Sequence, residues 1–593
     1  MKAFRVLSLL VVLAMLLSAC TTPAAEPAAP EAPPAATEAP AATEAPAATE
    51  APAATEAPVA TEAPKPTHDG IIRIGYIGKV KTFNPLYQSM AVESMHMRLF
   101  YERLFQYDLN ADVIPEMSVD MGTMSEDGLT YVFKIHENST FSDGMPVTAE
   151  DVAFSFNMYR TREDSRTITN MTFIDSVEAT GPYEVTFKLN EPRPNFRALL
   201  AGTWWIIPKH IWEPKATDPN LADFTQLDAE IVGSGPWILK EIKIDEYAYF
   251  LPRTDHHQYP PKANGLILQT FANNDATVQA LIAGQVDLIE RVPLTALDAI
   301  KAAENVEVVS GMPAGPSVDE LIINNVVPEL CPADYQATCG GHPALRDVVV
   351  RRAMHHATNQ EKMIELVYGG MATKGTTLVP PASTYYNPDV TKYEYDLAKA
   401  NALLDEAGYL DTNGDGVRNM PGGGEELIFN LNFDPGPAYS RQAEILDESF
   451  KQIGIKLEIA PMESSALGPF VNPQYEHDLV IWGWSTGVDP DFMLSLTTTE
   501  MITNASSEVG YSNAEYDQLY KEQATALTDD IRKEKIFRMQ EIFMEELPYI
   551  VFFYKDSIFA YRTDKFEGWK FTDDKGLVAS QNTPALSNVV PVY

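Results

Sequence analysis

The sequence predicts a mixed α/β protein whose folded part is divided into two lobes. The chain has 593 residues, and residues 68–593 are too many for one ordinary hydrophobic core, which rarely grows beyond about 250–300 residues. Segments with alternating apolar residues, typical of strands, are interleaved with segments whose apolar residues recur at helical spacing. This interleaving is typical of α/β folds rather than of all-helical or all-β folds.

Residues 1–19 predict an export signal. Lys2 and Arg5 precede the apolar run 6–17, which is too short for a permanent membrane-spanning helix. The run leads through Leu-Ser-Ala into Cys20, a pattern that resembles the processing box of bacterial lipoproteins. The resemblance implies that the leader is removed and that Cys20 carries lipid. An ordinary signal peptide with an incidental cysteine is the alternative.

Residues 20–67 predict the lipid-bearing cysteine followed by a stalk that does not fold. The repeat AATEAP runs four times from 35 to 58 and once more as VATEAP to 64. It contains no aromatic residue, so burial of side chains cannot offset the loss of chain entropy. Because proline recurs every six positions, the stalk is expected to be extended and to hold the folded part away from the lipid surface.

The net charge limits the partners that the protein can have. The two basic residues of the leader and the seven glutamates of the stalk account for −5 of the net charge of −39, which leaves −34 on residues 65–593. Such a charge repels the phosphates of nucleic acids and anionic lipid headgroups. We therefore expect no nucleic-acid partner and a membrane association that depends on the lipid anchor alone.

The amino-terminal half of the folded part opens with a strand of period two at 71–78. A helical pattern around 92–108 follows, and then strands at 130–136, 183–190 and 232–242 that are separated by turns rich in Asp, Gly and Ser. Thr148 and Asp151 form the capping box of a helix at 146–159.

The carboxyl-terminal half continues the alternation. Segment 276–290 reads as a short helix, a glycine stop and a strand. Further strands are expected at 306–311, 319–325, 427–433, 455–459, 478–485 and 548–554. Further helices are expected at 344–357, 359–368, 395–409, 440–454 and about 513–547, and glycines end three of them.

Several segments, taken together, resemble the extracellular solute-binding proteins of family 5, which are peptide-, nickel- and oligosaccharide-binding receptors of ABC importers. The segments FSDGMPVTAEDVAFSF, VGSGPWIL, ALIAGQVDLI, YDLAKANALLDEAGY and DLVIWGW follow one another in the order of that family. The resemblance covers roughly residues 70–593. It implies a receptor that captures a solute between two lobes and passes it to a membrane permease and its ATPase.

The resemblance also implies the architecture, which is a periplasmic-binding-protein-like fold of class II with an interlobe cleft and a discontinuous first sub-domain. We expect sub-domain I at 68–112, 231–318 and 546–593, sub-domain II at 113–230, and sub-domain III at 319–545. A monomer is expected, exported and held by lipid at the outer face of the cytoplasmic membrane.

No pattern of an enzyme stands out in the chain. Zinc-protease and phosphate-loop motifs are absent from the sequence. An exported glycosidase would need two carboxylates that the sequence does not single out. We therefore expect no enzyme activity and no required cofactor.

The segment DTNGDGVRNMPGGGEE predicts a structural calcium site. Asp411, Asn413 and Asp415, followed by Gly416, match the first half of an EF-hand-type loop. Gly422 stands where a bidentate glutamate is expected, so an Asx-rich surface turn is the alternative.

Cys331 and Cys339 are the only other cysteines. In an oxidising compartment their spacing predicts a local disulfide, because a zinc site needs more ligands.

The segment DLVIWGWS, residues 478–485, predicts one wall of the ligand site. Alternation places Trp482 and Trp484 on the same face of a strand, where their rings could stack on a sugar or on an apolar side chain. The resemblance places the end of this strand, with Ser485 and Asp489, at the cleft. In the peptide-binding members an acid in this loop pairs with the α-ammonium group of the ligand, but here no acid precedes Asp489.

That departure leaves two ligand classes open. Peptide is the usual ligand of the family, and a cello-oligosaccharide-like sugar is the alternative. Asn84, Tyr87, Asn324 and Trp205 are further candidate ligand-binding residues, and each of them could also be structural.

Overall fold

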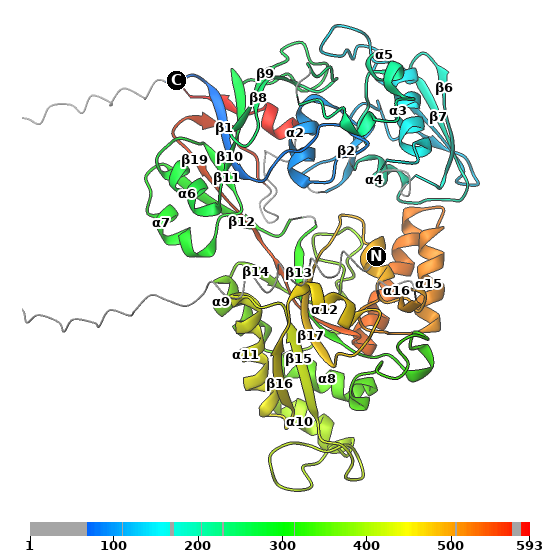
Figure 1. Cartoon of the computed structure of the whole chain (residues 1–593), viewed down its shortest axis with the longest axis vertical. Helices are drawn as coiled ribbons and strands as arrows, with labels where there is room; N and C mark the ends of the chain where they lie inside the picture. Colours follow the sequence, from blue (N-terminus) through cyan, green and yellow to red (C-terminus); the bar gives the residue numbers. More distant parts are fainter. Residues whose placement is uncertain are drawn as a thin grey trace, which may run out of the picture. The chain divides into compact units, whose positions relative to one another are not determined.

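The computed structural model describes residues 68–109, 111–165, 171–202, 204–227, 230–313, 315–503, 507–571 and 583–592. The predicted leader, Cys20 and the predicted stalk to residue 67 lie outside these residues. Over the described ranges, no helix is both long enough and apolar enough to cross a membrane. The described part has two lobes, each built on its own large sheet (Figure 1).

The amino-terminal lobe is built on a seven-stranded mixed sheet. Its strand order is β12-β19-β11-β1-β10-β9-β8, and the central strand β1 runs parallel to both of its neighbours. The strands are β1 (Ile71–Ile77), β8 (Trp237–Lys243), β9 (Tyr247–Pro252), β10 (Gly265–Phe271), β11 (Leu288–Glu290), β12 (Val306–Gly311) and β19 (Ser557–Arg562). Helices α2 (Ala91–Phe100), α6 (Asn274–Ile282) and α7 (Leu297–Lys301) belong to the same lobe.

A four-stranded antiparallel sheet, in the order β4-β5-β7-β6, forms a second layer of this lobe. Its strands are β4 (Thr123–Met124), β5 (Thr130–Lys134), β6 (Ile174–Gly181) and β7 (Glu184–Leu189), and α3 (Ala149–Thr161) packs against it. The predicted capping box of α3 is confirmed, because the Asp151 carboxylate accepts the backbone N–H of Thr148 at 2.9 Å. The smaller elements are β2 (Phe105–Tyr107), β3 (Val113–Pro115), α4 (Phe196–Leu200), α5 (Lys209–Trp212), β20 (Phe566–Glu567), α17 (Thr583–Ser587) and β21 (Val590–Pro591).

The carboxyl-terminal lobe is built on a six-stranded sheet in the order β14-β18-β13-β17-β15-β16. The strands are β13 (Ser317–Ile323), β14 (Ala372–Lys374), β15 (Ile428–Phe433), β16 (Lys456–Pro461), β17 (Leu479–Ser485) and β18 (Tyr549–Lys555). The helices are α8 (Val348–His356), α9 (Gln360–Tyr368), α10 (Leu397–Glu406), α11 (Pro437–Lys451), α12 (Ser464–Val471), α13 (Asp491–Ser495), α14 (Glu500–Thr503), α15 (Ala514–Ala524) and α16 (Asp529–Glu546).

The chain crosses twice between the two large sheets. It leaves the amino-terminal sheet after β12 and enters the other sheet at β13, and it returns from β18 to β19 through Asp556. The predicted sub-domain boundaries stay a prediction. Strand β18, which the predicted segment 546–593 assigns to sub-domain I, pairs with β13 and β14 of the carboxyl-terminal sheet.

Two helices are shorter than the sequence pattern predicts. The helix expected around 92–108 ends at Phe100, because the chain turns there and Phe105–Tyr107 pairs with β3. The helix expected at about 513–547 is two helices. Thr528 interrupts it, since its hydroxyl accepts the backbone N–H of Ile531 and so begins α16 with a new N-cap.

The predicted disulfide is confirmed. Cys331 and Cys339 are bonded with an S–S distance of 2.08 Å. Both cysteines lie in the segment after β13, so the bridge closes this segment on itself. Cys331 also packs in a small apolar cluster with Val326, Tyr475 and Ile502.

Candidate functional site

The ends of the central strands of both lobes lie on the side where the chain crosses between the sheets. In the amino-terminal lobe, β11 ends at Glu290, opposite Phe559 near the start of β19, and β1 and β10 run parallel to β11. In the other lobe, β17 ends at Ser485, opposite Ser317 at the start of β13. Ligands of α/β proteins commonly bind outside the carboxyl ends of such strands, so this side is the candidate site.

A cavity of about 150 Å³ lies at the end of β1 in the amino-terminal lobe. Both apolar and charged side chains line it. They are Tyr76, Ile77, Ala91, Val92, Met95, Arg98, Asn274, Glu290 and Arg291. Burial lowers the pKa of Arg98 to about 10, so its guanidinium stays charged at neutral pH. The cavity could hold one small side chain or one polar end of a solute.

A larger cavity, of about 410 Å³, is lined by residues of both lobes. Its lining from the amino-terminal lobe is Met171, Thr172, Phe173, Arg193, Asn195, Phe196, Leu199, Leu200 and Trp204, and Asp491 comes from the carboxyl-terminal lobe. The Arg193 guanidinium lies 5.0 Å from the centre of the Phe173 ring. A cavity that is mostly apolar with a few charged groups suits a small organic solute.

The two predicted tryptophans share one face of β17. Trp482 lies opposite Glu320 of β13, and Trp484 lies opposite Val318. Both rings are half-buried. The indole N–H of Trp484 donates to Glu508 at 3.0 Å, and its ring meets Phe492 edge-on at 5.4 Å. Because Phe492 is 50% exposed, this aromatic pair reaches the surface near the end of β17.

Asp489 has a strong internal partner. Its two carboxylate oxygens accept hydrogen bonds from Arg532 at 2.6 and 2.9 Å, and the side chain of Arg532 is 1% exposed. Oδ1 of Asp489 also accepts the backbone N–H of Asp491 at the start of α13. The carboxylate is therefore already neutralised within the protein, while Ser485 beside it is exposed.

The other four predicted site residues make contacts within the fold. Asn84 is fully buried and donates to the carbonyls of Leu221 and Phe224. The side-chain amide of Asn324 donates to the backbone carbonyls of Tyr475 and His477.

Tyr87 donates to Asp164 at 2.9 Å. Trp205 is fully buried, with the Arg103 guanidinium 5.3 Å from its ring. The neighbouring Trp204 lines the larger cavity. The structure thus places Trp482, Trp484 and Ser485 at the end of β17 and Asp489 in the loop that follows, and it places Asn84, Tyr87, Asn324 and Trp205 elsewhere.

The predicted calcium loop is an exposed turn that is ordered by its own backbone. The Asp411 carboxylate accepts the backbone N–H groups of Gly414 and Gly416 at 2.7 and 2.9 Å, and these bonds lower its pKa. Asn413 donates to Asp415 and to Glu426. Oxygen-bearing side chains do converge here, so calcium binding by Asp411, Asn413 and Asp415 stays a prediction.

If this loop binds calcium, a chelator is expected to lower the melting temperature of the protein by about 2 °C or more, because a ligand of the folded state stabilises it. Differential scanning fluorimetry with and without EDTA measures the shift. The Asp411→Asn variant should lose most of the response. An equal melting temperature in both buffers would show that the loop is a plain turn.

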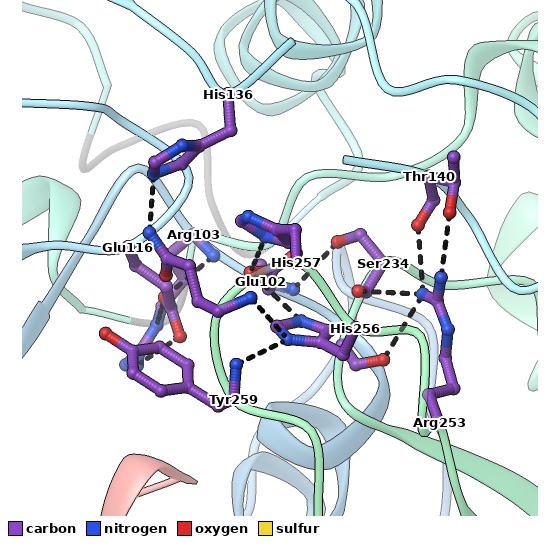
Figure 2. A network of polar contacts seen from close by, with 12 residues as sticks. Glu102, Arg103, Glu116, His136, Thr140, Ser234, Arg253, His256, His257 and Tyr259 are labelled. Carbon is purple, nitrogen blue, oxygen red and sulfur yellow. Dashed lines mark hydrogen bonds and ion pairs between the residues drawn. The ribbon is translucent and has the colours of Figure 1, made fainter. Parts of the chain in front are cut away.

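A second group of polar side chains joins the layers of the amino-terminal lobe (Figure 2). The ring nitrogens Nε2 of His257 and His256 lie 2.9 and 3.4 Å from one oxygen of Glu102, and the three ligand atoms lie within 4.8 Å of one another. Burial by itself would raise the pKa of Glu102. The opposite effect of the two neighbouring imidazoles is larger, so the pKa of Glu102 is lowered.

The tautomer of His256 favours a hydrogen-bond network over a metal centre at Glu102. Nδ1 of His256 accepts the backbone N–H groups of Gln258 and Tyr259 at 3.3 and 3.0 Å, so the ring proton lies on Nε2, which faces Glu102. A ligating histidine instead donates its second ring N–H to an acceptor. The sequence does not reveal this group, because Glu102 lies 155 residues from His257.

Two buried acids behind Trp484 are also missed by the sequence patterns. Glu508 accepts the Trp484 indole N–H, and Glu320 is fully buried on the same face of the sheet as the tryptophans. Glu508 belongs to no strand or helix, so no periodicity marks it. Glu320 is a charged residue within the mostly apolar strand β13, and this is the one feature of the sequence that indicates a buried acid here.

Comparison with known proteins gives one consistent result. The model of the bacterial extracellular solute-binding proteins, family 5, matches residues 112–503. The oligopeptide-binding protein AppA of Bacillus subtilis is 27% identical over 524 residues, which cover 86% of this chain and 91% of AppA. Heme-binding protein A of Haemophilus influenzae is 25% identical over 482 residues, covering 76% and 80% of the two chains.

Solved structures have the same fold. The structure of AppA from Bacillus subtilis in complex with a nonapeptide has a TM-score of 0.63 at 25% identity, and it covers 89% of this chain and 100% of its own. HbpA2 from Haemophilus parasuis has a TM-score of 0.74 at 22% identity, covering 88% and 100%. These matches confirm the predicted two-lobed α/β fold.

Proposed function

Because the chain belongs to family 5 of the bacterial extracellular solute-binding proteins, we propose that it captures a peptide-like solute between its two lobes and releases it unaltered. Members of this family are receptors rather than enzymes, and this chain is one of them. The observation that carries the proposal is the 410 Å³ cavity, which both lobes line. Closure over a solute would increase the contacts between the lobes and the solute, so binding would favour the closed form.

A peptide is supported by the relatives as well as by the cavity. The curated relative from Bacillus subtilis is named an oligopeptide-binding protein, and its structure holds a nonapeptide. In this chain the aromatic lining by Phe173, Phe196 and Trp204 would accept apolar side chains, while Arg193 and Asp491 could meet polar groups. An oligosaccharide is the second candidate, because Trp482 and Trp484 share one half-buried face that could stack on sugar rings.

The proposed setting is the outer face of the cytoplasmic membrane. The leader and Cys20 support a lipid anchor, the proline-containing repeats from 35 to 64 support an extended tether, and the family supports an ABC permease with its ATPase as the partner. A tether allows a receptor to reach a membrane partner while its solute site stays open to the medium.

The ligand can be identified directly. Native mass spectrometry of the protein purified from its own host should show an adduct, and denaturation should release a peptide whose mass accounts for the adduct. Recovery of a sugar would favour the second candidate. Recovery of a chemically converted product after incubation with the solute would overturn the receptor function.

A further inference from the structure

Two carboxyl groups lie buried behind the tryptophan face of β17. Glu508 is 6% exposed, and one of its oxygens accepts both the Trp484 indole N–H at 3.0 Å and the Tyr549 hydroxyl at 3.1 Å. Glu320 is 0% exposed, lies opposite Trp482 in the register of β13 and β17, and neither of its oxygens has a hydrogen-bond partner. A buried carboxyl group without a partner is costly, so this pair calls for an explanation.

Within the described part of the chain, no positively charged group acts on Glu508. The titratable groups that act on Glu508 or touch it are Glu320, Tyr475, Tyr549 and His477. Burial lowers the pKa of His477 to about 4, so its ring is neutral at neutral pH. Lys555 is near Glu320, but its ammonium group forms an ion pair with Asp319 at 2.7 Å. Among the described residues, the countercharge for Glu508 is therefore missing.

The acid after the tryptophan strand does not fill this role. Asp489 is paired through both oxygens with Arg532, so it has no net charge to offer a ligand. Glu508, in contrast, is held by two neutral donors, and it touches the ring edge of Trp484, whose face is half-buried at the end of β17. An aromatic face beside a carboxylate is a good receptor for an ammonium group, because the ring and the acid both attract it.

We propose that Glu508 binds an ammonium group of the captured peptide, with the group resting against Trp484, and that Glu320 is a positioning residue behind Glu508. The proposal rests on the peptide-receptor function proposed above and names the group that the receptor selects. The ammonium group supplies the positive countercharge that is missing beside the two acids. Trp484 holds the accepting carboxylate in place through its indole N–H.

The proposal predicts a pH dependence of binding. Burial raises the pKa of Glu508 to about 7. The pKa of Glu320 is raised well above its usual value by burial and by the nearby charge of Glu508. A carboxyl group with a raised pKa is protonated below that pKa, and only the ionised form attracts an ammonium group. Affinity for a cationic peptide should therefore be high above pH 7 and fall about tenfold for each pH unit below it.

Three pools of synthetic tetrapeptides test the proposal on the intact protein by isothermal titration calorimetry. The first has a free amino terminus and no lysine, the second has an acetylated amino terminus and one lysine, and the third is acetylated and lacks lysine. All three pools exclude arginine. We expect the third pool to bind at least tenfold more weakly than the better of the first two, and that better pool identifies whether the α-ammonium or the lysine ammonium is recognised.

The Glu508→Gln variant should abolish the difference between the pools. The matched control is Glu546→Gln, because Glu546 is another carboxylate of the same lobe that is held by a tyrosine and an asparagine, at 2.6 and 2.9 Å, and it should keep the difference. Should Glu508→Gln fail to fold, the wild-type affinities at pH 7.5 and 5.5 decide the matter, since only the cationic pools should weaken.

The outcomes separate the two proposals. Equal binding of all three pools by the wild-type protein, or an unchanged preference in Glu508→Gln, would overturn the role of Glu508 and leave the peptide receptor standing. Binding of none of the pools would overturn the peptide ligand itself, and the assignment of Glu508 would fall with it.

Discussion

Replacing Arg532 by methionine is expected to lower the free energy of unfolding of the carboxyl-terminal lobe by about 3–5 kcal/mol, which is the usual cost of removing one partner of a buried ion pair. The guanidinium donates to both oxygens of Asp489 and lies 4.7 Å from the ring of Tyr385. Burial alone would lower the pKa of Arg532, but Asp489 raises it overall. Methionine would leave the half-buried Asp489 carboxylate without its countercharge.

Arg538→Met is the matched control for this experiment. Arg538 lies in the same helix, α16, and its guanidinium forms surface ion pairs with Glu515, Glu541 and Glu545. Exposed pairs of this kind contribute about 0–1 kcal/mol. Urea unfolding followed by circular dichroism compares the two variants. A cost for Arg532→Met no larger than that for Arg538→Met would show that the Asp489–Arg532 pair does not stabilise the lobe.

Trp484→Ala is expected to weaken the binding of a peptide by at least tenfold while the fold remains intact. The change removes an aromatic surface, and one stacked ring contributes about 0.5–1.5 kcal/mol beyond its buried area. It also removes the N–H group that orients Glu508. Both effects weaken the contact with the same ligand group. Calorimetric titration with the free-amine peptide pool measures the loss.

Trp569→Ala controls for the removal of a large side chain. Trp569 is another half-buried tryptophan, and it packs against the core of the amino-terminal lobe beside Tyr561 and Phe566. It should lower stability without changing affinity. Equal affinity of Trp484→Ala and the wild-type protein would remove Trp484 from the ligand site.

The fold could largely be predicted from the sequence because its signals are local. Period-two alternation marks strands such as β1 and β17, and the Thr148–Asp151 capping box marks the start of α3. The failures have local causes as well. The apolar spacing of 513–547 continues across Thr528, but the hydroxyl of that residue caps a new helix, and spacing alone cannot reveal that competition.

The candidate site was only partly predictable because it depends on contacts between distant segments. Strand alternation places Trp482 and Trp484 on one face, but it cannot show that Arg532, 43 residues beyond Asp489, pairs with that acid. Glu508 likewise lies 24 residues beyond Trp484, in a segment outside any helix or strand. The pair His256 and His257 faces one carboxylate because it lies in a loop, whereas neighbouring residues of a helix point apart.

Pulsed electron paramagnetic resonance between spin labels on the two lobes shows directly whether the lobes close over a solute. The turn at Gly128 and the loop at Leu527 approach each other across the lobes, since a Cβ on Gly128 would lie 3.0 Å from Leu527. Spin labels at the exposed positions Met124 and Ile531 lie near these two segments. With the peptide pool that binds best, we expect the distribution of label-to-label distances to shift to one shorter, narrower peak. An identical distribution with and without a bound peptide would contradict a receptor that closes over its solute.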